Sequence, residues 1–151
     1  MIEKQLLQNL SKRFGIRCET LERDYVMNLI LDSFIHVPSA ANGFFFKGGA
    51  CVHKCFSRHM FDPQQPVYSY FTQGRFSNDI DLTVVPQMMD EEALHSVFQE
   101  VKEYLYDRHG LIINQFSFQI HNNSKQLIED REKMNCRGYI HFKGPMFNPK
   151  F

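Results

Sequence analysis

The apolar positions in the first 40 residues recur three and four apart, which predicts two amphipathic helices. The first helix covers residues 2–14 and ends near Gly15, where a left-handed residue can terminate it. The second begins at Thr20, the expected N-cap, and is broken by Pro38 and the small residues 39–43. The inward positions are Ile2, Leu6, Leu7 and Leu10 in the first helix, and Leu21, Tyr25, Leu29 and Ile30 in the second. Both helices are expected to be packing elements.

After residue 43 the pattern changes to short apolar runs and alternating segments, which predict strands interleaved with helices. Strands are expected over residues 44–46, 79–85, 111–121 and 135–143, helices over 50–56 and 90–109, and a surface loop over 57–73. At 151 residues the chain has the size of one ordinary domain. We therefore expect a single α/β (α+β) domain at 1–151, with a helical part at 1–40 and a small mixed β-sheet core with packed helices at 43–143.

Two carboxylates stand one residue apart in the stretch GRFSNDIDLTVV, residues 74–85. Because side chains alternate along a strand, Asp79, Asp81 and Thr83 share one face. The opposite face carries Ile80, Leu82 and Val84. Carboxylates about 7 Å apart repel each other unless a cation lies between them, and oxygen ligands suit Mg²⁺ or Mn²⁺. The alternative is that the two carboxylates are ordinary solvent-exposed side chains on an edge strand and bind nothing.

A second candidate feature is the step from the Phe44-Phe45-Phe46 strand through Lys47-Gly48-Gly49 into a helix. Glycine lets a ligand approach the backbone, and the N-terminus of a helix offers free N–H groups, so this is a phosphate-binding geometry. The alternative is a tight strand-to-helix turn with Lys47 as an ordinary charge at the end of the strand.

The amino-acid composition argues against some classes of binding partner and does not identify one. Seventeen Lys and Arg balance seventeen Asp and Glu, so no global charge favours a nucleic acid or an anionic membrane. No apolar run approaches the ~20 residues of a membrane span, and the N-terminus lacks the apolar segment of a secretory signal, which predicts a cytoplasmic protein. The scattered cysteines favour reduced thiols. On a helix, His53 would point away from Cys51 and Cys55, which disfavours zinc.

The order of these motifs resembles a known family. The chain resembles the AbiEii/AbiGii nucleotidyltransferases of abortive-infection and toxin–antitoxin systems in two runs that are separated by a helix. These runs are Phe46-Lys47-Gly48-Gly49-Ala50 and Arg75-Phe76-Ser77-Asn78-Asp79-Ile80-Asp81-Leu82-Thr83-Val84. The upstream segment Leu21-Glu22-Arg23-Asp24-Tyr25-Val26 also looks like that family. The resemblance covers roughly residues 15 to 90 and rests on three ordered motifs.

The resemblance implies a DNA polymerase β-like nucleotidyltransferase core and metal-dependent transfer of a nucleotide from a nucleoside triphosphate to an acceptor, for which RNA is one candidate. Asp79 and Asp81 would be the catalytic pair and would ligate Mg²⁺ or Mn²⁺. The nucleotide-binding residues would be Lys47, Gly48, Gly49, Arg75 and Ser77, with Arg75 neutralising a phosphate and Ser77 donating a hydrogen bond. An antitoxin encoded nearby would be a further partner.

The chain also departs from the family pattern. The usual Thr after the glycines is Ala50, and no third carboxylate stands on a later strand. The only later acids, Glu129, Asp130 and Glu132, lie in a polar, helix-like segment at 124–134. We therefore expect the chain to be the N-terminal portion of such a protein and to transfer nucleotides poorly or not at all. A sheet edge left open by a missing strand would favour self-association.

Two other functions stay open. One is a catalytically impaired nucleotide-binding or regulatory module with the same fold. The other is a haloacid-dehalogenase-like phosphatase, because residues 79–83 match its Asp-x-Asp-x-Thr signature. In that class an apolar strand precedes the first Asp, whereas here the apolar run follows the pair.

Overall fold

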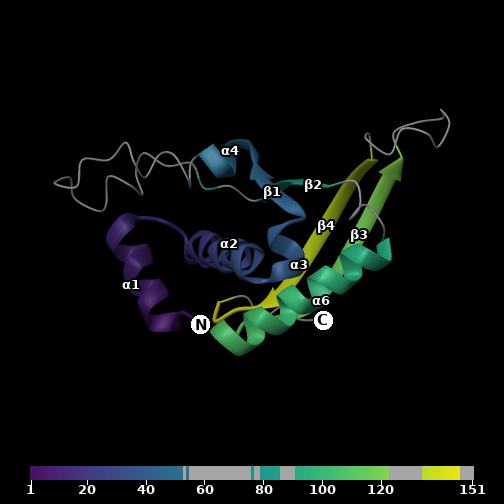
Figure 1. Ribbon diagram of the computed structural model, residues 1–151. Helices are drawn as coiled ribbons and strands as arrows, with labels where there is room; N and C mark the ends of the chain where they lie inside the picture. Colours follow the sequence, from purple (N-terminus) through teal and green to yellow (C-terminus); the bar gives the residue numbers. More distant parts are fainter. Residues whose placement is uncertain (53, 55–75, 77–78, 86–90, 123–133, 147–151) are drawn as a thin grey trace.

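The computed structural model describes residues 1–52, 54, 76, 79–85, 91–122 and 134–146 (Figure 1). The helices are α1 (Lys4–Phe14), α2 (Cys18–His36), α3 (Pro38–Ala41), α4 (Gly48–Cys51) and α6 (Glu91–His109). The strands are β1 (Phe44–Lys47), β2 (Asp81–Val84), β3 (Ile112–Asn122) and β4 (Met134–Lys143). The predicted mixed α/β class is confirmed. In the described part of the chain, no helix is long and apolar enough to cross a membrane.

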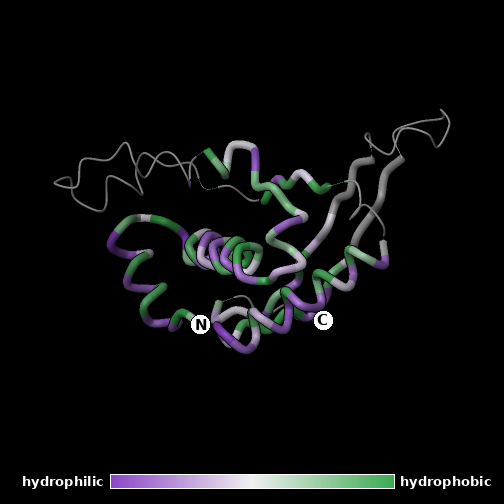
Figure 2. The backbone as a smooth tube through the Cα atoms, in the orientation of Figure 1, coloured by the Kyte–Doolittle hydropathy of each residue, from purple (hydrophilic) through white to green (hydrophobic). Residues whose placement is uncertain are grey.

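Helices α2 and α6 build the core together with the start of β3. Both helices alternate apolar and polar positions along their length (Figure 2), and their apolar sides meet. The buried residues are Val26, Ile30 and Phe34 from α2, Leu94, Val97, Phe98, Val101 and Leu105 from α6, and Leu111 and Ile113 at the start of β3. The helix predicted over residues 90–109 is thus confirmed as α6, and its apolar residues face the core.

The first sheet is attached to this core through Phe44. Its ring centroid lies 5.1 Å from that of Phe34 and 5.9 Å from that of Phe98, so one aromatic residue from β1 fills the space between the two helices. β1 pairs antiparallel with β2, with Phe44 opposite Val84 and Lys47 opposite Asp81. The core therefore fixes the position of a short two-stranded sheet, and that sheet carries Lys47 and Asp81, one residue from each predicted motif.

The second sheet is a long antiparallel pair of β3 and β4, which runs beside α6 as a ribbon (Figure 1). Ile113 is buried, and Phe116, Ile140 and Phe142 pack against the core from one side of the ribbon. A shift in register near Ile113 and Gln115 marks an irregularity in the pairing.

The structure corrects two expectations about local structure. Helix α2 begins at Cys18 and not at Thr20, because the carbonyl of Arg17 already accepts hydrogen bonds from the N–H groups of Thr20 and Leu21. Pro38 does more than end α2, since it occupies the first position of the short helix α3, where its missing N–H is tolerated.

The strands also differ from the expected arrangement. Within the described residues they form two separate antiparallel pairs, whereas a single small mixed sheet was predicted. The sequence pattern identifies which segments are strands, but it carries little information on which strands pair.

Candidate functional site

The two predicted motifs meet where β1 turns into α4. Lys47 ends β1 opposite Asp81, and Gly48 follows with φ of +76°. A Cβ atom on Gly48 would lie 3.0 Å from both Cβ and Cγ of Asp81 and closer still to its Oδ2. Both the left-handed backbone and the crowding require glycine at this position. The side chain of Asp81 therefore packs directly against the backbone of the glycine turn.

Gly49 differs from its neighbour. Its φ is not positive, and a Cβ atom placed on it would meet no atom within 4 Å among the described residues. The turn itself therefore requires glycine at 48 but not at 49. This open space lies beside the start of α4, whose first residue is Gly48.

The exposed face of the first sheet carries the predicted carboxylates. Asp79, Asp81 and Thr83 are exposed, whereas Ile80, Leu82 and Val84 pack against the core. This confirms the predicted division into two faces. Lys47 is exposed as well and lies opposite Asp81 across the pair of strands. The Asp81 carboxylate and the Lys47 ammonium thus belong to paired residues beside the glycine turn.

A partly buried ion pair connects the segment after α4 to α2. The Nζ of Lys54 donates hydrogen bonds to Oδ1 of Asp24 at 2.6 Å and to Oδ1 of Asn28 at 2.9 Å. The two charged side chains are only 11% and 23% exposed, so solvent screens them less than a surface pair. Asp24 belongs to the 21–26 motif, which the structure thereby connects to Lys54, in the segment after α4. Sequence reasoning did not identify Lys54.

Glu22, in the same motif, has a different role. It is fully buried, and its Oε1 accepts a hydrogen bond from the backbone N–H of Met146 at 2.7 Å. A Cβ atom on Gly144 would lie 2.7 Å from Cδ of Glu22, so the chain after β4 passes close to this carboxylate. Glu22 therefore links the end of β4 to α2.

Part of the predicted site lies outside the described residues. This holds for Arg75 and Ser77, for the later acids Glu129, Asp130 and Glu132, and for His53 and Cys55. In the ranges that the structure describes, no three His, Cys, Asp or Glu side chains gather to hold a metal ion. The described part of the site therefore offers the carboxylates of Asp79 and Asp81, Lys47, and the glycine turn.

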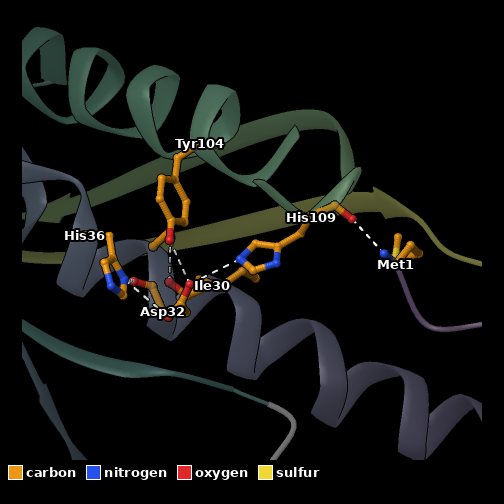
Figure 3. Close-up of polar contacts among 7 residues, drawn as sticks. Met1, Ile30, Asp32, His36, Tyr104 and His109 are labelled. Carbon is orange, nitrogen blue, oxygen red and sulfur yellow. Dashed lines mark hydrogen bonds and ion pairs between the residues drawn. The ribbon is translucent and has the colours of Figure 1, made fainter. Parts of the chain in front are cut away.

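A second polar cluster lies between α2 and α6 (Figure 3). The carboxylate of Asp32 accepts hydrogen bonds from the Tyr104 hydroxyl at 2.9 Å and from Nε2 of His109 at 3.1 Å. Nδ1 of His36 lies 3.3 Å from the other carboxylate oxygen. The two histidines approach from opposite sides of the carboxylate, and the Met1 ammonium donates to the His109 carbonyl. This cluster joins α2, α6 and the N-terminus.

The cluster shifts the pKa values of two of its members. Burial would raise the pKa of Asp32, but hydrogen bonds from Tyr104 and His109 and the charges of His36 and His109 outweigh it, so the pKa lies below its ordinary value. The pKa of Tyr104 is raised by burial, by its hydrogen bond to Asp32 and by the negative charge of that carboxylate. Asp32 is thus an ionised acceptor that holds two helices together.

Comparisons of the chain with protein-family models, with curated proteins and with solved structures found no match.

Proposed function

We propose that the chain binds a nucleoside triphosphate with Mg²⁺ or Mn²⁺, in a nucleotidyltransferase core of the DNA polymerase β type. The observation that carries the proposal is the packing of Asp81 against Gly48, at the point where β1 turns into α4. This packing brings a carboxylate to the turn at which α4 begins, where a Cβ atom on Gly49 would meet no atom within 4 Å among the described residues. The family resemblance of the same residues supports the proposal.

The residues present fit a hard divalent cation. Asp79 and Asp81 supply carboxylate oxygens on an exposed face, which are the ligands that Mg²⁺ and Mn²⁺ prefer. A bound ion would supply neutralisation of phosphate charge. The chain's own residues would orient the nucleotide: the backbone N–H groups at the start of α4 would hold phosphate oxygens, and the Lys47 ammonium would attract them.

The position of Asp81 favours this proposal over the phosphatase alternative. Asp81 is the first residue of β2, and β2 pairs antiparallel with β1. A phosphatase of the haloacid-dehalogenase type uses carboxylates at the C-terminal end of a parallel strand. The carboxylates in this chain lie at the opposite end of their strand.

The proposal is tested by isothermal titration calorimetry, which measures the affinity of the chain for each of the four nucleoside triphosphates in the presence of Mn²⁺. The Asp79→Asn/Asp81→Asn double variant should lose at least tenfold in affinity, because the two metal ligands are removed. Asp107→Asn removes an exposed carboxylate on α6 and should bind like the wild type. Equal affinity in all three proteins would remove the metal site from β2.

A transfer assay decides between an enzyme and a binding module. Labelled nucleoside triphosphates are incubated with the chain, Mg²⁺ or Mn²⁺ and a mixed RNA pool, and label on the RNA is measured. Transfer that Asp79→Asn abolishes would establish a nucleotidyltransferase. Nucleotide binding without transfer to RNA, to the chain itself or to added protein would establish the binding module.

A further inference from the structure

Phe45 is an exposed aromatic residue on the same sheet face as Asp81. Side chains alternate along β1, so Phe44 faces the core while Phe45 and Lys47 face outward. The side chain of Phe45 remains 57% exposed. The register places Thr83 opposite Phe45 and Asp81 opposite Lys47. The outer face of the first sheet therefore consists of an aromatic ring, a hydroxyl, an ammonium and a carboxylate.

The neighbours of Phe45 distinguish it from the other exposed apolar residues. Single exposed apolar side chains are common on protein surfaces. Phe45, however, lies diagonally across the two strands from Asp81, a spacing of about 7–8 Å between such positions. It also lies three residues before Gly48, along the strand away from the turn. Phe45 is therefore within reach of a nucleotide whose phosphates lie at the turn and whose metal ion lies at Asp81.

We propose that Phe45 is the platform on which the base of the bound nucleotide stacks. The inference rests on the proposed function and adds the recognition of the base. The flat, apolar part of a nucleotide is its base, and an exposed phenyl ring offers that base a matching surface. The site thus has a charged end at Lys47 and Asp81 and an apolar end at Phe45, matching the two ends of a nucleoside triphosphate.

Stacking has a consequence for specificity. Every base has a π-face, so a phenyl platform binds all four bases and discriminates weakly among them. Phenylalanine has no polar atom with which to recognise the edge of a base. We therefore expect the affinities for the four nucleoside triphosphates to lie within about tenfold of one another, with the larger purines binding more tightly.

The test compares Mg²⁺-ATP with Mg²⁺-tripolyphosphate, which has the phosphates but no base. Binding to the wild type, Phe45→Ala, Phe45→Tyr and Tyr106→Ala is measured by calorimetry. Phe45→Ala should weaken ATP binding roughly 5- to 150-fold and leave tripolyphosphate binding unchanged, whereas Phe45→Tyr keeps the ring and should keep the ATP affinity. Tyr106→Ala is the matched control, because it removes a ring that is 60% exposed on α6.

The outcomes separate this inference from the proposed function. If the wild type binds both ligands and Phe45→Ala weakens them equally, or weakens neither, the platform is wrong while the phosphate and metal site stands. If the wild type binds neither ligand, the proposed function fails and the platform fails with it. Loss of ATP affinity in Phe45→Ala, with tripolyphosphate affinity retained, is the result that the platform predicts.

Discussion

Two aspartates of this chain occupy opposite kinds of environment. Asp32 is surrounded by donors from its own chain, and these hold its carboxylate between α2 and α6. Asp81 lies exposed on a sheet face, packed against the backbone of Gly48 and opposite Lys47. A carboxylate whose partners are supplied internally stabilises a fold, whereas one placed at an exposed glycine turn is available to a ligand. The contrast indicates which acidic residue to test for function.

The same contrast applies to the two glycines of the turn. Gly48 is required by its positive φ and by its contact with Asp81, whereas Gly49 has neither constraint. Gly48 therefore belongs to the fold, and Gly49 is the residue at which fold and ligand binding can be tested separately.

The largest effect is expected for Gly48→Ala. The alanine would have to adopt a left-handed backbone conformation, and its Cβ atom would overlap the Asp81 carboxylate. The free energy of unfolding should therefore fall by about 2–4 kcal/mol. Urea denaturation followed by circular dichroism measures this change. Gly49→Ala, the matched control, should shift stability by less than about 1 kcal/mol. Similar losses in the two variants would contradict the separate roles of the glycines.

A smaller loss is expected when the ion pair between α2 and the segment after α4 is broken. Lys54→Met leaves the mostly buried Asp24 carboxylate without its ammonium partner, which should cost about 1–2 kcal/mol of unfolding free energy. Asp24→Asn and the double variant complete a thermodynamic cycle. The double variant should lose less than the sum of the two single losses. Additive losses would show that the pair is not coupled.

The smallest effect concerns Asp32 and depends on pH. Because the pKa of Asp32 is lowered by folding, its ionised form stabilises the folded chain above the ordinary carboxyl pKa of 3.8, and this contribution is lost as pH falls through the lowered pKa. Asp32→Asn should cost less than about 1 kcal/mol at neutral pH, since the side chain is about one-third exposed.

The stability difference between the wild type and Asp32→Asn should therefore shrink as pH falls from about 6 to about 3. Denaturation curves at several pH values measure it, and Asp107→Asn on the exposed side of α6 serves as the control. A difference that is constant over this range would show that Asp32 is not linked to pH in this way.

The parts of the fold that the sequence could predict depend on local periodicity. The apolar stripe of α6, the strand through Phe44 and the two faces around Asp81 all follow from spacing within one segment. Two residues named above, Lys54 and Phe45, were not singled out from the sequence, for the opposite reason. Lys54 pairs with a residue 30 positions earlier, and the exposure of Phe45 depends on how β1 sits against the core, so neither has a local signal.

The central claim is that the turn between β1 and α4 binds the phosphates of a nucleotide beside Asp81. Measuring Mg²⁺-ATP affinity and unfolding free energy together for wild type, Gly49→Ala and Gly49→Val tests it most directly. Because a side chain at 49 enters open space at the start of α4, we predict a graded loss of affinity, tenfold or more for valine, with stability changed by less than about 1 kcal/mol. Unchanged affinity in a stably folded Gly49→Val protein would contradict the claim.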